Sequence, residues 1–281
     1  MKTRSLAFAF LWAASSVLAA SKPSVPHSEE ASNLAARVYS SLAGSYFNLF
    51  SADIVGFDAV FSVAKDGQAL GKMNVRWNRG DEKAIARLEQ KAEARVRSTA
   101  EALIGDHVVS LLVWGPFKSA LGPGPGVYGM KSGDEYVLDA SEKSSKKRPE
   151  LESHFLFASA DLTRLRNLLA RKDGTVLDMR YSSQAAEGKQ LIHSTSTTGR
   201  SSGKTSWKVD VTFTYTHTEG TVFVKRAITK RTSGDKTTTW TAVLESVRFR
   251  KGVATSGSEK GAASTEDSGE EGLRDRFWGE M

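Results

Sequence analysis

The clearest alternation of apolar and polar residues lies in the C-terminal part of the chain. From Trp207 to Tyr215, apolar side chains take every second position, and Lys, Asp and Thr take all of the positions between them. Successive side chains of a strand point to opposite faces, so this run has one apolar and one polar face. Two further runs rich in Thr and Val, 221–229 and 237–249, follow after short turns. The pattern predicts an antiparallel three-stranded meander over 207–249.

A second hairpin pattern lies nearer the N-terminus. Apolar residues alternate with polar or small ones over 57–63 and again over 69–77, and Asp66-Gly67 between the two runs is a strong turn signal. Residues 161–171 fit either a helix or a strand. Shorter strand signals, most of them beside Gly-containing turns, occur at 127–130, 136–140, 155–157, 175–181 and 190–195.

Three other segments have helical spacing. Apolar residues recur every four positions over 28–49, and a narrow apolar stripe runs between charged residues over 81–103. Residues 107–121 are more apolar and predict a buried helix, with a strand as the less favoured alternative. The lysines and the arginine within 143–148 predict a basic loop. Taken together, the elements predict an α+β fold that is mainly antiparallel β: a curved sheet or incomplete β-barrel covered by helices.

The two ends of the chain differ from its middle. Residues 1–20 combine Lys2 and Arg4 with an apolar run and a small-residue end, which is typical of a cleaved export signal; an uncleaved membrane anchor is the alternative. Residues 252–281 are rich in Gly, Ser, Glu and Asp and predict a disordered acidic tail with one aromatic pair, Phe277-Trp278. Residues 21–251 are then one domain. Because cysteine is absent, a bacterial periplasm suits the chain better than a eukaryotic extracellular space.

Charge is unevenly distributed along the chain. The whole chain carries +7, of which the first twenty residues contribute +2 and the tail −4, so residues 21–251 carry +9. A basic body attracts anionic surfaces such as phospholipid headgroups, although ordinary solvation of the charges is the simpler interpretation. We expect no nucleic-acid partner.

No catalytic or metal-binding signature is present. Residues 199–205 resemble a phosphate-binding loop, but the spacing between the glycines is one residue short, and the loop leads into a predicted strand rather than a helix. The five histidines are not at ligand spacing, so no metal is expected. Residues 199–203 have the spacing Gly-x-Ser-x-Gly, but the predicted strand that follows them is not the helix that a nucleophile elbow needs. A Ser-His-Asp site assembled in space stays open. We therefore expect a protein that is not an enzyme and has no cofactor.

Aromatic and large apolar residues concentrate on the predicted strands and the buried helix. A packed core is the ordinary interpretation; the sharper hypothesis is a curved sheet whose concave face holds an apolar ligand. The candidate cavity residues are Phe57, Phe61, Met73, Val75, Trp77, Leu111, Trp114, Trp207, Val211 and Phe213.

The order of these elements is similar to that of the bacterial periplasmic lipoprotein-carrier family (LolA/LolB-like) over roughly residues 28–250. The segments that carry the resemblance follow the N-terminal helix and are Phe57-Asp58-Ala59-Val60-Phe61, Asp66-Gly67-Gln68, Val75-Arg76-Trp77, the run Tyr128 to Leu138, and Arg171-Lys172-Asp173-Gly174-Thr175-Val176. Trp77-Asn78-Arg79-Gly80 lacks the family's Arg-Pro, and the helix predicted over 81–104 looks like an insertion.

The resemblance implies an incomplete barrel wrapped around helices, here 28–49 and 106–121, with a cavity for the acyl chains of lipid or lipoprotein. It thus implies a non-enzymatic periplasmic carrier. The alternative is an envelope interaction or scaffold protein that has the same fold and a filled core. The oligomeric state stays open.

Overall fold

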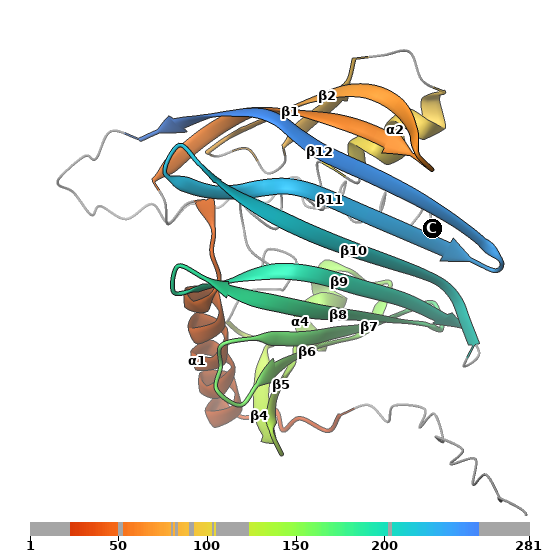
Figure 1. Cartoon of the computed structure of the whole chain (residues 1–281). Helices are drawn as coiled ribbons and strands as arrows, with labels where there is room; N and C mark the ends of the chain where they lie inside the picture. The colour runs from red at the N-terminus through yellow and green to blue at the C-terminus, as the bar shows by residue number, and fades with distance from the viewer. Residues whose placement is uncertain are drawn as a thin grey trace, which may run out of the picture.

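A computed structural model describes residues 23–49, 53–79, 81, 84–89, 93–102, 104, 124–201 and 204–252. These residues form one antiparallel twelve-stranded sheet that curves without closing (Figure 1), with the strand order β3-β2-β1-β12-β11-β10-β9-β8-β7-β6-β5-β4. The predicted α+β class and the curved sheet are confirmed. The strands are β1 Ile54–Lys65, β2 Gln68–Asn78, β3 Ile85–Leu88, β4 Tyr128–Ser132, β5 Glu135–Asp139, β6 Leu151–Ser159, β7 Leu165–Lys172, β8 Thr175–Ala186, β9 Lys189–Ser201, β10 Lys204–Thr218, β11 Thr221–Ser233 and β12 Lys236–Lys251.

Three helices accompany the sheet within the described ranges: α1 Glu29–Ser45, α2 Ala94–Ala102 and α4 Ser141–Lys147. The side chain of Ser28 caps α1 by accepting a hydrogen bond from the Ala31 N–H, as the predicted start requires. Helix α1 approaches β4 closely, because a Cβ placed on Gly129 of β4 would lie only 3.0 Å from the backbone nitrogen of Ala35. None of the helices in this part of the chain is long and apolar enough to cross a membrane.

The predicted turns reverse the chain where expected. At the β1–β2 turn, Asp66 and Gly67 have φ values of +50° and +81°. Two consecutive residues with positive φ are typical of the tight type I′ hairpin turn, whose twist matches that of the strands it joins. The same pairing of an acidic residue with glycine recurs at Asp173-Gly174, Glu187-Gly188 and Glu219-Gly220. The predicted meander over 207–249 is confirmed as β10–β12.

The N-terminal hairpin joins the C-terminal meander through β1 and β12. Phe57 lies opposite Phe249 in this antiparallel pair, and the register continues to Lys65 opposite Trp240. Local sequence patterns did not predict this long-range pairing. It places the two predicted apolar faces side by side in one sheet, whose ends are β3 and β4.

Two predictions need correction, and one open alternative is resolved. Residues 81–104 are not one helix: Ile85–Leu88 pair with β2 as edge strand β3, because Leu88 is buried beside Met73. Helix α2 follows over Ala94–Ala102. The predicted basic loop is helix α4, in which Lys146 pairs with Glu142 one turn earlier. The ambiguous segment 161–171 contains strand β7, which is hydrogen-bonded on both sides. The predicted export signal, the 107–121 helix and the acidic tail lie outside the described residues, apart from Gly252.

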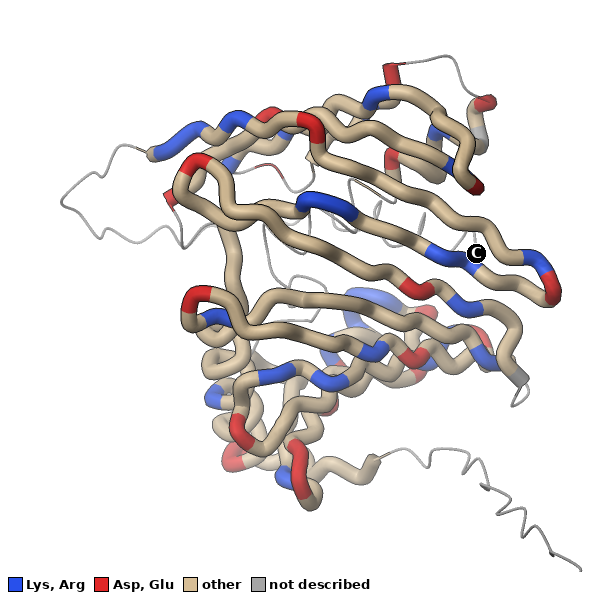
Figure 2. The backbone as a smooth tube through the Cα atoms, in the orientation of Figure 1, with Lys and Arg blue, Asp and Glu red and all other residues tan. Residues whose placement is uncertain are grey.

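Two hydrophobic clusters lie on opposite faces of the sheet. The larger cluster contains residues of α1, α2 and most of the strands, and we call its side of the sheet the inner face. The smaller cluster lies on the outer face of β5 and β6 and contains Val137, Phe155 and Phe157, against which Val25 packs. Charged residues occur both at the turns and along the strands (Figure 2).

Candidate functional site

Eight of the ten predicted cavity residues lie in the described part of the chain. Trp207 is half-buried and packs against the inner core, while Leu111 and Trp114 lie outside the described residues. The other seven belong to the inner core and are at most 1% exposed: Phe57, Phe61, Met73, Val75, Trp77, Val211 and Phe213. The fold therefore brings these predicted residues into one cluster.

One end of the inner face is filled by aromatic rings. Phe223 of β11 is fully buried, and its ring centroid lies 5.1 Å from that of Phe57 and 5.5 Å from that of Phe249, in edge-to-face contacts. Phe57 also contacts Trp77, with 6.0 Å between the ring centroids. Such distances and angles are those of a packed aromatic core. At this end, the side chains themselves occupy the space between the strands.

The other end of the inner face is lined by smaller side chains. Trp240 lies opposite Thr229, Thr229 opposite Val211, and Val211 opposite Thr195, so these four residues form one row across β12, β11, β10 and β9. Each of them is at most 8% exposed. Ala242 and Ala227 lie opposite one another in the neighbouring row. Apart from Trp240, the residues of this region carry at most three side-chain heavy atoms beyond the backbone.

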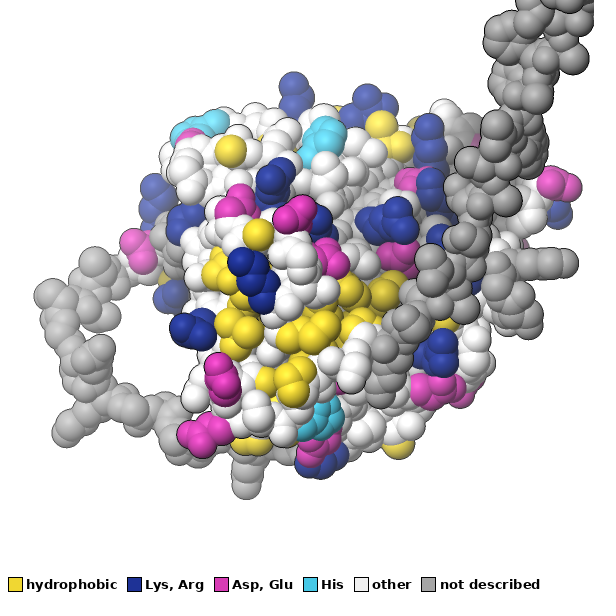
Figure 3. Space-filling view, turned by 90° about the horizontal axis from the view of Figure 1, so that it is seen from below, with side chains coloured by type: hydrophobic (Ala, Val, Ile, Leu, Met, Phe, Trp, Pro, Cys, Tyr) yellow, Lys and Arg dark blue, Asp and Glu magenta, His cyan; other side chains and the backbone are white. Residues whose placement is uncertain are grey.

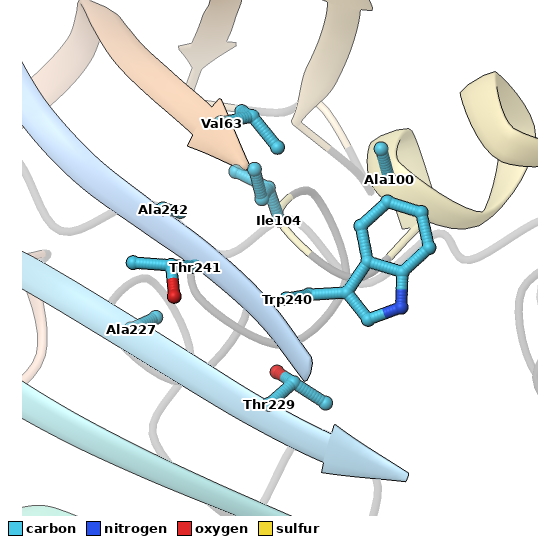
Figure 4. A pocket seen from close by; sticks show the side chains of 8 residues that line it. All are labelled: Val63, Ala100, Ile104, Ala227, Thr229, Trp240, Thr241 and Ala242. Atoms are coloured by element: carbon cyan, nitrogen blue, oxygen red, sulfur yellow. The ribbon is translucent and has the colours of Figure 1, made fainter. Parts of the chain in front are cut away.

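A small cavity lies in this region, between the sheet and the helical segment that covers it. It has a volume of about 10 Å³, and Ala100 and Ile104 close it from the side of α2. Figure 4 shows the Trp240 ring pointing from β12 towards Ala100. The side chains that line it are those of Val63, Ala100, Ile104, Ala227, Thr229, Trp240, Thr241 and Ala242, none of which is ionisable. The chemistry available in this space is therefore apolar contact plus the hydroxyl group of Thr229, which shares its row with Trp240.

A cation lies beside this cavity. The Nζ atom of Lys65, at the end of β1, is 5.5 Å from the centre of the Trp240 ring. A lysine at this distance from an indole face is attracted by the negative face of the ring. Lys65 is half-buried and precedes the β1–β2 turn. The geometry thus puts one positive charge next to an apolar space.

Sequence reasoning selected large aromatic residues and overlooked the small ones. Ala227, Thr229 and Ala242 belong to the same alternating pattern as Phe213 and Val211, but a pattern of apolar positions does not show how much volume the side chains leave. The sequence signal for this space was the decrease in side-chain size along β11, from Val222-Phe223-Val224 to Ala227 and Thr229.

Tyr215, near the C-terminal end of β10, is partly buried. The Tyr215 hydroxyl donates a hydrogen bond to the backbone oxygen of Ile192 at 2.5 Å, and burial raises the pKa of this phenol well above its usual value. The phenol therefore stays neutral and acts as a structural link between β10 and β9.

A buried Ser–His pair joins α4 to β6. Ser144 Oγ lies 2.8 Å from His154 Nδ1, while Ser144 is 0% and His154 3% exposed. The His154 N–H donates to Ser141 Oγ, which ties the same two elements together. A nucleophile must reach its substrate, and this serine is closed to solvent, so the pair is a structural contact. Within the described ranges, no group of three or more His, Asp and Glu residues could hold a metal ion.

The segment that resembles a phosphate-binding loop is part of a β-hairpin. Gly199 lies in β9 and faces Trp207 of β10, and strand β10 begins at Lys204. The predicted continuation into a strand is confirmed, so the backbone behind this loop has no helix N-terminus that could bind phosphate.

Comparison with known proteins identifies no family. No family model and no curated protein matches the chain. Among solved structures, one titled "Crystal structure of MucB in complex with MucA(peri)" matches over 78% of this chain and 99% of the other chain, with 9% sequence identity and a TM-score of 0.17. A likeness at this TM-score supports no inference about fold or function. The similarity to lipoprotein carriers therefore stays a prediction.

Proposed function

We propose that the protein is an exported, non-enzymatic binding protein that holds an acyl chain of a lipid or lipoprotein on the inner face of its sheet. The observation that carries this proposal is the change in side-chain size along that face. Aromatic rings fill one end, whereas Ala227, Thr229 and Ala242 leave room at the other. We assign the acyl chain to the end with the small side chains.

The chemistry of the row suits a flexible hydrocarbon. Val211 and Trp240 offer apolar contact, and the threonines present a methyl as well as a hydroxyl group. Burial of apolar surface contributes about 25 cal/mol per Å², so an acyl chain gains affinity from each methylene it buries. Because the cavity of about 10 Å³ is much smaller than an acyl chain, binding requires the segment containing Ala100 and Ile104 to move away from the sheet.

Lys65 supplies a place for the polar end of the ligand. Its ammonium group lies beside Trp240, at the edge of the apolar row. An anionic carboxylate or phosphate could pair with this group while the hydrocarbon lies along the row. The proposal therefore includes a preference for anionic over neutral acyl compounds.

The experiment is binding of a fluorescent fatty acid by the purified full-length exported chain. Thr229→Phe fills the row and should lower the affinity at least about tenfold, although overpacking will also cost about 1–3 kcal/mol of stability. Thr212→Phe is the matched control, because Thr212 is exposed on the opposite face of the neighbouring strand. Thr229→Val keeps the shape of the side chain and should retain binding, which separates loss of space from loss of the hydroxyl group.

A second pair of ligands tests the role of Lys65. Lys65→Gln should weaken binding of the fatty acid but leave binding of the fatty alcohol of the same length unchanged. Equal loss for Thr229→Phe and Thr212→Phe, or no binding by the wild type, would refute the acyl-binding proposal.

The packed aromatic end favours one alternative, an envelope interaction or scaffold protein whose core is already full. The contacts of Phe223 with Phe57 and Phe249 leave no space there. Native mass spectrometry of protein purified from its host distinguishes the two functions. Co-purifying lipid favours the carrier, and a ligand-free mass favours the scaffold.

A further inference from the structure

We propose that a groove beside helix α1 binds the chain's own C-terminal segment, through Phe277 and Trp278. This docking site is separate from the acyl site and does not depend on it. Three observations support it: an apolar groove, a strained residue that shapes the groove, and the charge and sequence of the tail.

The groove is open and largely apolar. It has a volume of about 540 Å³, within the range of roughly 300–1,000 Å³ typical of small-ligand sites. It runs along α1, with Tyr136 of β5 and Leu162 of the β6–β7 loop also in its lining. The lining residues are Leu34, Ala36, Arg37, Val38, Ser40, Ser41, Tyr136 and Leu162. Figure 3, seen from below, shows hydrophobic side chains gathered at the centre of one face of the molecule, with charged side chains around them; α1, β4 and β5 lie at this lower end in Figure 1.

Leu162 has a backbone conformation that leucine rarely adopts. Its φ is +57°, in the left-handed region, which costs a non-glycine residue on the order of 1 kcal/mol or more. Neighbouring contacts hold it there: Ser159 Oγ donates to Asp161 Oδ1 at 2.5 Å, and the Thr163 N–H donates to the same oxygen at 3.1 Å. Leu162 is only half-buried although it lines an apolar groove. Its side chain packs against the inner core, and the part that stays exposed lines the groove, where a partner can contact it.

The tail has the chemistry that fits this groove. Phe277-Trp278 is an aromatic pair in a largely polar tail. Asp275 and Glu280 lie two residues before and after the pair, and Arg274 and Arg276 precede it. Arg37 is the one charged residue among the lining residues, and it can pair with either acid. The tail carries −4 and residues 21–251 carry +9, so docking also brings opposite net charges together.

The tail is long enough to reach. The N–H of Gly252, where the described chain ends, donates to the backbone oxygen of Asp53. Ser41 in the groove precedes Asp53 by twelve residues, so the two lie at most about 43 Å apart, by the extended length of the chain. Phe277 follows Gly252 by 25 residues, which span about 25–30 Å on average as a Gly/Ser-rich coil and about 85 Å when extended.

The absence of cysteine allows a clean cross-linking test in the full exported chain. Ser41→Cys places one thiol in the groove and Gly279→Cys places another beside the aromatic pair. The control combines Gly279→Cys with Ser246→Cys, an exposed serine of β12. Under mild oxidation, we expect an intramolecular disulfide to form about tenfold faster in the groove pair than in the control, because docking raises the local thiol concentration.

Two further variants show whether the aromatic pair is responsible. Phe277→Ala with Trp278→Ala should reduce the groove cross-link to the control rate, and so should Leu34→Asp in the groove. Melting temperatures of these variants verify that the domain stays folded. Docking of the tail within its own chain would be overturned by equal cross-linking rates in the groove and control pairs. It would also be overturned if the aromatic substitutions left the groove rate unchanged, or if cross-linked dimers formed in place of monomers.

Discussion

Arg250 of β12 pairs with the carboxylate of Asp58 on β1, where the N-terminal hairpin meets the C-terminal meander. The guanidinium of Arg250 also donates to the backbone oxygen of Trp77 at 3.0 Å and to Asn78 Oδ1 at 2.7 Å, both on β2. One side chain therefore links three strands. Its planar fork of donors suits this arrangement better than the single ammonium of lysine would.

We predict that Arg250→Lys and Arg250→Ala both lower the free energy of unfolding. The side chain is 35% exposed, which weakens its ion pair, so we expect a loss of about 1–2 kcal/mol for alanine. Arg248→Ala is the control: it removes an exposed arginine of the same strand and should change stability by no more than about 0.5 kcal/mol. Urea denaturation measures both. Equal effects of the two alanine substitutions would show that Arg250 does not link the strands energetically.

Two glycines give opposite predictions for the same substitution. A Cβ on Gly199 would lie 2.3 Å from the indole of Trp207, so Gly199→Ala should cost about 1–3 kcal/mol. A Cβ on Gly44 in α1 would meet no atom within 4 Å, so Gly44→Ala should stabilise the protein by about 0.5–1 kcal/mol. Thermal unfolding of both variants measures these stability changes. A Gly199→Ala variant that melts at the wild-type temperature or above would contradict the packing of Trp207 over Gly199.

Acid stability should depend on Asp161. Hydrogen bonds from Ser159 and Thr163 lower its pKa from 3.8 to about 2. A carboxylate whose pKa is lower in the folded state stabilises that state above about pH 4, and the contribution disappears as the pH falls towards 2. Asp161→Asn should therefore destabilise the protein at pH 7, and its difference from the wild type should shrink between pH 4 and pH 2.

Urea midpoints measured across that pH range test this expectation. Asp235→Asn, in the turn before β12, controls for the loss of one surface carboxylate. A difference between Asp161→Asn and the wild type that does not change with pH would refute the assigned role of the carboxylate.

Local patterns in the sequence predicted the parts of the fold that depend on neighbouring residues. Alternation located β1, β2 and the meander, and paired acidic and glycine residues located the turns, because a tight hairpin needs positive φ at both positions. The pairing of β1 with β12 was not predictable in this way, since no turn joins the two strands. Residues 85–88 were mistaken for part of a helix because their register with β2, and not their own propensity, makes them a strand.

The candidate site was predicted only in part. The residues chosen as large and apolar do meet in the core, where their contacts use up the space they surround. The space proposed for a ligand depends on Ala227, Thr229 and Ala242, which are inconspicuous in a sequence. Side-chain volume on a curved face is a property of three or four strands together, and hydrophobic pattern alone does not report it.

Photolabelling is the most direct test of where an acyl chain binds. The purified protein is irradiated with a fatty acid that carries a diazirine near the middle of its hydrocarbon, and labelled tryptic peptides are identified by mass spectrometry. We expect labels on the peptides 227–230 and 237–248, which contain Thr229 and Trp240, and we expect these labels to disappear when unlabelled fatty acid is added in excess. Labels confined to other peptides, or labelling that excess fatty acid does not reduce, would contradict acyl binding on the inner face.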